Sequence, residues 1–183
     1  MRDFWKNVDD NMINIYTSRK LEAAIKPIKL DKEIVESNQS LNFNAHIFLI
    51  DRKKCIFFTQ KETCYSFAIM DFKKSDFKYL DVLFYKAFES QLISDHLYEI
   101  GGEQYLNRFC TEIQLYQTDN DQKTLGIIRD SIYRIDSWRY NSPNRNIGLV
   151  AKYILSYQNE IPIGSLKYKN AKEMMKTELE NHA

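Results

Sequence analysis

Glycine, proline and cysteine are all scarce in this chain of 183 residues, which has five, three and three of them. So few glycines and prolines leave little room for long irregular loops or low-complexity linkers. The cysteines are odd in number and form no CxxC pair, which favours buried thiols in a reducing compartment over a disulfide framework. No apolar run approaches the roughly 20 residues of a transmembrane helix, and the polar N-terminus is unlike a signal peptide. We therefore expect a compact cytoplasmic protein that does not contact the membrane.

An excess of charge of one sign is also missing. Lysine and arginine number 26 against 25 acidic residues, for a net charge of +1. A general nucleic-acid binder needs excess positive charge to neutralise phosphates, so only a local basic face stays open. Aromatic residues, in contrast, are plentiful, with twelve tyrosines and eleven phenylalanines that supply a core. We expect an appendage over residues 1–11 and one domain over 12–183, with Met1 and Met12 both open as start sites.

Apolar periodicity predicts that strands come early in the chain and helices late. "MINIYT" indicates a short strand from Met12, followed by a cap at Thr17 or Ser18 and a helix that ends before Pro27. A loop is expected over residues 28–42. Three apolar runs separated by charged turns then predict an antiparallel β-meander buried on both faces, and "TEIQLYQT" adds a later strand. The meander runs are "FNAHIFLI" (43–50), "KCIFFTQ" (54–60) and "TCYSFAIM" (63–70).

Helical spacing dominates the rest of the chain. Aromatic and aliphatic residues at three- and four-residue steps predict a helix from Ser75 or Asp76 to about Leu92. Helices are also expected over 103–109, after a break at Gly101-Gly102, then up to Ile135, around 150–155 and near 170–180, with a loop over 139–146. The fold class is α+β: an antiparallel β-meander sheet with helices packed on it and a helix-rich C-terminal half.

The stretch "TDNDQKTLGIIRD" (118–130) has the polar residues of a metal or phosphate loop in the wrong order. A calcium loop that starts at Asp119 would have lysine and threonine where it needs a ligand and a glycine. A phosphate loop needs glycines ahead of its lysine, and here Gly126 follows. Asp119 and Asp121 fit helix capping instead. Gly126 inside the helix costs about 1 kcal/mol relative to alanine, which indicates close packing of another group.

Four residues form the candidate catalytic set, of a small hydrolase or nuclease: His46, Cys64, Asp119 and Asp121. His46 lies mid-strand, and no HxH, HxxxH or HExxH spacing exists for a metal, so a structural histidine is the favoured interpretation. Cys64 lies among apolar residues, although a reactive thiol needs an electropositive, partly exposed setting. "DFK" at 71–73 fits a turn better than a magnesium nuclease. We expect no metal and no cofactor.

A basic and aromatic cluster surrounds the predicted loop: Arg139, Tyr140, Arg145 and Lys152. Arginine binds phosphates and stacks on bases, and tyrosine offers a stacking surface, so the cluster suits nucleic acid. The same residue types form hot spots of protein interfaces. Ordinary solvated loops also carry such residues, so a loop without a binding role is a third interpretation and the favoured one.

Four segments together resemble an uncharacterised bacterial domain family, labelled only as a domain of unknown function and found beside plasmid ORF-three-like domains. They are "IYTSRKL", "FNAHIFLIDRKKCIFF", "TCYSFAIMDFKKSDFKYLDVLFYKAF" and "TDNDQKTLGIIRDSI". The resemblance spans roughly Ile13 to Leu179. It implies the strand and helix order above and an occurrence in bacteria and mobile elements. It carries no activity, so no catalytic residue follows from it.

From these observations we expect a non-enzymatic binding module, a regulator or inhibitor that acts through protein–protein contacts and is encoded by a mobile element or phage. The alternative is a nucleic-acid-binding protein that uses residues 139–152. A small hydrolase or nuclease is the third hypothesis.

Overall fold

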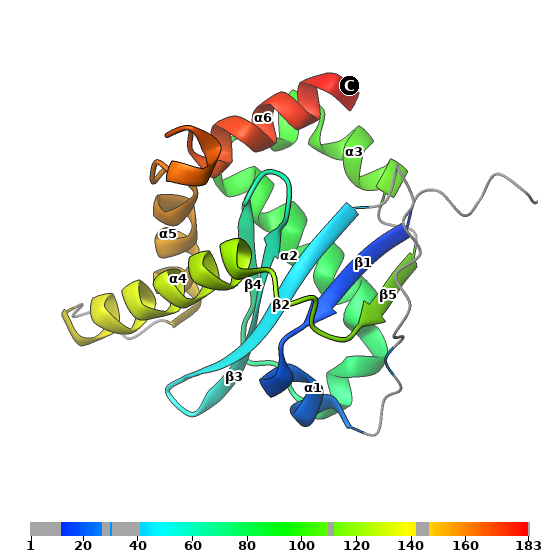
Figure 1. Cartoon of the computed structure of the whole chain (residues 1–183), viewed down its shortest axis with the longest axis vertical. Coiled ribbons are helices and arrows are strands. Elements are labelled where there is room, and N and C mark those ends of the chain that lie inside the picture. The colour runs from blue at the N-terminus through cyan, green and yellow to red at the C-terminus, as the bar shows by residue number, and fades with distance from the viewer. Residues whose placement is uncertain (1–11, 27–29, 31–40, 110–111, 142–146, 183) are drawn as a thin grey trace, which may run out of the picture.

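The protein folds around one five-stranded sheet with helices on both sides (Figure 1). The computed structural model describes residues 12–26, 30, 41–109, 112–141 and 147–182. The predicted appendage at 1–11, Cys110 and most of the predicted loop at 28–42 lie outside these residues. The strands are β1 (Met12–Thr17), β2 (Leu41–Ile50), β3 (Lys53–Gln60), β4 (Ser66–Ile69) and β5 (Glu112–Tyr116).

The sheet is mixed, with the strand order β4-β3-β2-β1-β5. Strands β2, β3 and β4 form the predicted antiparallel meander. Strand β1, however, runs parallel to both β2 and β5, so the expectation of an antiparallel sheet holds for three of the five strands. Asp51 and Arg52 make the β2–β3 turn with positive φ angles of 47° and 65°, which suits a two-residue hairpin. The link from β1 to β2 is a crossover that contains a helix, as parallel neighbours require.

Six α-helices and three short 3₁₀ helices lie in the described part of the chain. The α-helices are α1 (Arg19–Ile25), α2 (Leu80–Ser94), α3 (Gly102–Phe109), α4 (Gln122–Asn141), α5 (Ile147–Asn159) and α6 (Ala171–His182); the 3₁₀ helices are η1 (Lys74–Tyr79), η2 (Tyr98–Ile100) and η3 (Gly164–Leu166). The helix predicted from Ser75 or Asp76 therefore begins as a 3₁₀ segment. Helix α4 continues beyond Ile135 to Asn141, so residues 139–141 are helical, where the sequence predicted a loop.

Side-chain hydrogen bonds explain where two of these helices begin. Ser18 Oγ accepts a hydrogen bond from Leu21 N at 3.3 Å, which makes Ser18 the cap of α1. Asn170 Oδ1 accepts one from Glu173 N at 2.7 Å, and Glu173 Oε2 accepts one from Asn170 N at 3.2 Å. This reciprocal pair is a capping box that satisfies two otherwise free amides at the start of α6.

One side of the sheet packs against α1, α2, α3 and α6 through the larger apolar cluster. Alternate residues of β2, β3 and β4 meet α2 there, in an aromatic centre where Phe67 and Phe88 stack at 4.8 Å and Phe43 meets Phe84 edge-on at 5.1 Å. All four rings are at most 1% exposed. Burying one such side chain stabilises the fold by about 1.5–3 kcal/mol. This cluster accounts for the rigid attachment of α2, the strongest helix of the sequence pattern.

The other side of the sheet is divided into two parts. Helices α4 and α5 cover β3, β4 and the end of β2 through a smaller apolar cluster, to which α4 contributes Ile128 and Ile135 and α5 contributes Ile154 and Leu155. On β1, β5 and the start of β2, most residues on the same side are polar or are tyrosines. The sequence therefore places a polar patch next to the start of α4, and most of this patch is buried.

Candidate functional site

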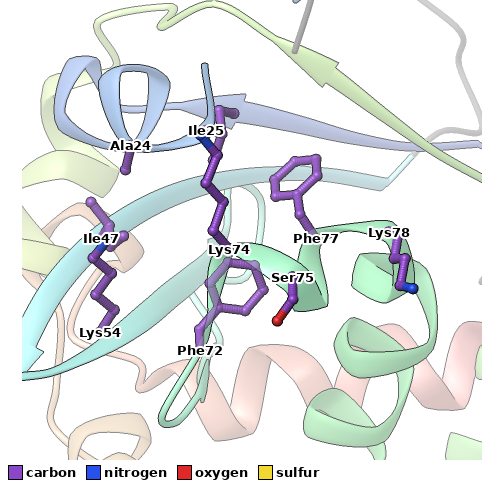
Figure 2. Close-up of a pocket in the computed structure, with 9 residues that line it drawn as sticks. All are labelled: Ala24, Ile25, Ile47, Lys54, Phe72, Lys74, Ser75, Phe77 and Lys78. Atoms are coloured by element: carbon purple, nitrogen blue, oxygen red, sulfur yellow. The ribbon is translucent and has the colours of Figure 1, made fainter. Parts of the chain in front are cut away.

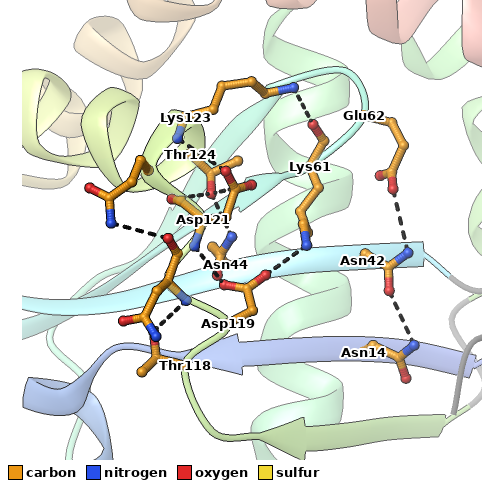
Figure 3. Close-up of polar contacts among 12 residues, drawn as sticks. Asn14, Asn42, Asn44, Lys61, Glu62, Thr118, Asp119, Asp121, Lys123 and Thr124 are labelled. Carbon is orange, nitrogen blue, oxygen red and sulfur yellow. Dashed lines mark hydrogen bonds and ion pairs between the residues drawn. The ribbon is translucent and has the colours of Figure 1, made fainter. Parts of the chain in front are cut away.

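Polar side chains and two tyrosines line the part of this side of the sheet that α4 and α5 do not cover, and most of them are buried, since Asn14, Tyr16, Asn44 and Tyr116 are at most 4% exposed. Strand register explains it, because β1 pairs in parallel with both neighbours and thereby aligns like positions in rows. One row is Asn14, Asn42 and Gln114, and the next is Tyr16, Asn44 and Tyr116. Figure 3 shows Asn14 reaching Asn42 and Asn42 reaching Glu62, along a line of hydrogen bonds of 3.2 and 3.4 Å.

This polar patch ends where β1 and β5 reach their carboxyl ends. Helix α1 follows β1 onto one side of the sheet, and α4 follows β5 onto the other side. In α/β sheets, such a switch in direction opens the crevice where ligands bind. Here the two strand ends are joined by hydrogen bonds: Thr17 Oγ1 donates to Tyr116 O at 2.8 Å, and Thr118 N donates to Glu22 Oε1 at 3.0 Å.

Next to these strand ends, Lys61 pairs with Asp119 at 2.6 Å and lies 4.7 Å from the ring centre of Tyr16. The Tyr16 ring in turn stacks on Tyr116 at 5.5 Å. Burial raises the pKa of Tyr16, and Lys61 only partly opposes this. Burial lowers the pKa of Lys61, but the hydrogen bond and charge of Asp119 outweigh it and leave that pKa raised. At neutral pH the pair is therefore a phenol and an ammonium, and neither is a proton acceptor.

Asp119 and Asp121 serve the start of α4. Asp119 Oδ1 accepts a hydrogen bond from Asp121 N at 3.1 Å, and Asp121 Oδ1 accepts one from Lys123 N at 3.0 Å. Thr124, which is fully buried, donates to Asp121 at 3.0 Å and accepts from Asn44 of β2 (Figure 3). The capping prediction is confirmed, with Asp121 as the cap. Asn44 and Thr124 were missed, because a strand asparagine and a helix threonine give no local signal of their contact.

Gly126 does not have the role that the sequence suggested. A Cβ atom added at this position would meet no other atom within 4 Å, so no close neighbour requires a glycine. The expectation of close packing at Gly126 was wrong.

His46 and Cys64 lie apart on the sheet. His46 is opposite Phe57 on β3, whereas Cys64 follows β3 in a turn where its amide donates to Gln60 O at 2.9 Å. Gln60 lies opposite Phe43, three residue steps from His46, a separation of roughly 10 Å along a strand. Burial, and then Lys20, lower the pKa of His46, and burial raises the pKa of the Cys64 thiol. The structure does not bring this pair together as a nucleophile and its base.

Side chains of the kinds that bind metals do not gather in the described part of the chain. No group of three or more histidine, cysteine, aspartate or glutamate side chains there could hold a metal ion. Cys55 and Cys64 are both buried free thiols. Asp71 of "DFK" lies in the turn before η1 and pairs with Lys53 at 2.9 Å, as the turn interpretation expected.

The basic and aromatic cluster predicted at 139–152 spans the link between α4 and α5. Arg139 and Tyr140 belong to the last turn of α4, and Lys152 belongs to α5. Their side chains, and Arg145 entirely, lie outside the described part of the chain. The role given to them stays a prediction.

Helices α4 and α5 present large aromatic side chains to solvent in their described part. Tyr133 is 75% exposed and Trp138 is 49% exposed on α4, and Tyr153 is 73% exposed and Tyr157 is 53% exposed on α5. Tyr153 and Tyr157 are one helical turn apart and therefore share a side of α5. Sequence reasoning missed these four, because helical periodicity alone does not separate buried from exposed aromatics.

A second polar cluster lies deep inside the protein, centred on Asp95 at the end of α2, which is 1% exposed. Its carboxylate accepts hydrogen bonds from Tyr65 Oη at 2.6 Å, from Asn159 Nδ2 at 3.1 Å and from Gln91 Nε2 at 3.2 Å. Asn159, the last residue of α5, also exchanges two hydrogen bonds with the backbone of Ser66. This cluster holds α2, β4 and α5 together.

A family model described as a domain of unknown function (DUF6933) matches residues 14–174. No curated protein and no solved structure matches the chain. In the described residues, no helix is both long enough and apolar enough to cross a membrane.

Proposed function

We propose a function for a chain that belongs to the DUF6933 family of domains of unknown function: it is a binding module that acts through protein–protein contacts. Its binding surface is the solvent-facing part of α4 and α5, called here the α4–α5 surface and defined by Tyr133, Trp138, Tyr153 and Tyr157. Such a module would act as a regulator or an inhibitor of the protein that it binds.

The exposure of Tyr153 and Tyr157 carries this proposal. Tyrosine and tryptophan supply large contact areas with little loss of side-chain freedom, and they dominate the binding energy of protein interfaces. Two such side chains one turn apart on α5, with two more on α4, supply several anchors on one pair of packed helices. Exposed arginines at 129 and 134 on α4 add the third residue type enriched in hot spots.

The attachment of the two helices supports the same conclusion. Their inner side is fixed to the sheet by the smaller apolar cluster, and Asn159 ties the end of α5 to β4 and to Asp95. A surface presented by rigidly held helices loses little conformational entropy on binding, which favours affinity. The anchors are therefore presented in a fixed arrangement.

The test compares two variants in quantitative affinity purification from the native host. The first is the double variant Tyr153→Ser with Tyr157→Ser. The control is Tyr168→Ser, which changes a tyrosine that is 80% exposed and lies outside the α4–α5 surface. We expect a partner that the wild type and the control retain and the double variant loses at least tenfold. Each hot-spot residue contributes about 2 kcal/mol or more, so the loss is well within detection. Equal recovery by both variants would contradict the proposal.

Nuclease treatment during the same purification separates the alternative function. If capture depends on nucleic acid and disappears in Arg139→Ala with Arg145→Ala, the chain binds nucleic acid through residues 139–152. Binding of that kind would also weaken steeply with added salt, because phosphate contacts release counterions.

A further inference from the structure

The strongest unassigned feature is a pocket of about 440 Å³ between α1, the β2–β3 hairpin and η1. It lies on the opposite side of the sheet from α4 and α5 and is therefore separate from the α4–α5 surface. Its volume falls within the ~300–1,000 Å³ of small-molecule sites. The described residues that line it are Ala24, Ile25, Ile47, Lys54, Phe72, Lys74, Ser75, Phe77 and Lys78 (Figure 2).

Apolar side chains form the floor of this pocket. Ile25, Ile47 and Phe72 are at most 5% exposed and belong to the larger apolar cluster, so the pocket opens directly onto the core. The Phe72 and Phe77 rings meet edge-on at 6.3 Å. An apolar group that enters this pocket is removed from water, which favours binding.

The charged side chains that line the pocket are all of one sign. Three lysines line it, Lys54 from β3 and both Lys74 and Lys78 from η1, and its described lining includes no carboxylate. Figure 2 shows Lys54 and Lys74 with their aliphatic stems along the pocket. Lysine stems commonly cover apolar surface in this way while the ammonium group stays in water.

These lysines differ from others near them. Lys53 pairs with Asp71 at 2.9 Å and Lys61 pairs with Asp119, whereas among the described residues no ion pair involves Lys54 or Lys74. The ammonium group of Lys78 lies over the ring of Tyr79, 4.8 Å from its centre. Asp76 is next to the pocket in sequence, but its carboxylate accepts hydrogen bonds from Lys73 N and Ser75 Oγ at 2.9 and 3.2 Å. Lys54 and Lys74 bring two like charges to an apolar pocket, and an anion placed there would relieve their repulsion.

We propose that this pocket binds a small anionic amphiphile, a molecule with an apolar body that fills the space over Phe72 and Phe77 and one carboxylate or similar head at the lysines. The apolar floor supplies most of the affinity, and the lysines select the sign of the head group. A neutral or cationic amphiphile of equal length lacks the second contribution and binds more weakly.

The first experiment measures which head group the purified full chain prefers. Decanoate, decanol and decyltrimethylammonium, each below its micelle concentration, displace the fluorescent anionic probe anilinonaphthalene sulfonate from the protein. We expect decanoate to bind on the order of tenfold more tightly than decanol, and the difference to shrink with salt, since each exposed charge pair changes affinity by a factor of roughly 1.4 to 5. Equal affinities of the three compounds, or no displacement by millimolar decanoate, would overturn the proposal.

Two variants then locate the site. The double variant Lys54→Gln with Lys74→Gln should weaken the binding of decanoate about tenfold and leave the binding of decanol unchanged. The control, Lys167→Gln with Lys169→Gln, removes the same charge from exposed positions elsewhere and should change the binding of neither compound. Ala24→Phe should fill the pocket and block both compounds, with circular dichroism and the melting temperature as the check of folding. Unaltered decanoate binding in the first variant, or in a folded Ala24→Phe protein, would show that the amphiphile binds elsewhere.

Discussion

Removing the single hydroxyl of Tyr65 tests how much the buried cluster around Asp95 contributes to stability. Tyr65 is fully buried and donates to the Asp95 carboxylate at 2.6 Å, and Asp95 is itself 1% exposed. Tyr65→Phe leaves the ring in place and takes away one of the donors that compensate a buried negative charge. A hydrogen bond to a charged group contributes about 1.5–3 kcal/mol, so the free energy of unfolding should fall by about 2 kcal/mol.

Urea and thermal unfolding followed by circular dichroism measure this loss. For a chain of this size, 2 kcal/mol corresponds to a decrease of roughly 4–8 °C in melting temperature. The matched control is Tyr168→Phe, which removes a hydroxyl from a side chain that is 80% exposed and should change the free energy by less than about 0.5 kcal/mol. A Tyr65→Phe protein as stable as the control would refute the reasoning that Asp95 depends on this donor.

Asp95→Asn provides the complementary test. An amide in place of the carboxylate has one acceptor oxygen, and its NH₂ group would face the donors of Tyr65, Gln91 or Asn159. We expect a loss larger than that of Tyr65→Phe, since a buried donor is then left without an acceptor. If Asp95→Asn unfolded at higher urea than the wild type, the cost of burying the charge would exceed the value of its hydrogen bonds.

Three further predictions concern pH and the start of α4. Burial, and then Asp95, raise the pKa of Tyr65 well above its usual value of about 10. At high pH the native state therefore keeps a proton that the unfolded state loses, so this contribution to stability is present below about pH 10 and decreases above it. The difference in unfolding free energy between wild type and Tyr65→Phe should accordingly shrink between about pH 9 and 11. Gly126→Ala should raise the melting temperature and the free energy of unfolding by about 0.5–1 kcal/mol, because the added methyl group meets no neighbour; a decrease would show that the glycine has a role that the packing does not reveal. Asp121→Ala should lower the free energy of unfolding by about 0.5–2 kcal/mol, whereas Asp130→Ala, an exposed change within α4, should leave it nearly unaltered in the same urea titration.

Local patterns in the sequence determined much of the secondary structure. The spacing of Leu80, Phe84 and Phe88 identifies the buried side of α2. The sequence also located two helix starts to within a few residues, and the structure then selected Ser18 and Asp121 as the caps. These features depend on residues a few positions apart, whose geometry is set by the period of the helix. The strands β2, β3 and β4 could also be predicted together with their antiparallel order, because short charged turns separate their apolar runs.

The parallel placement of β1 between β2 and β5 depended on the tertiary structure. Met12–Thr17 and Glu112–Tyr116 are about a hundred residues apart, and either strand alone fits a parallel or an antiparallel neighbour equally well. Their pairing is decided when the whole sheet buries its two sides, with α1 and α4 on opposite sides. Such a choice depends on contacts across the complete fold, and no local pattern contains it.

The candidate surfaces show the same division. Composition alone indicated many aromatic residues, a near-neutral charge and buried cysteines, since these follow from counts and local surroundings. Which tyrosines face solvent on α4 and α5, and which lysines surround the pocket over Phe72, followed only from the packing of helices on the sheet. Exposure is a property of the side of an element left without a neighbour, and the neighbours come from distant parts of the chain.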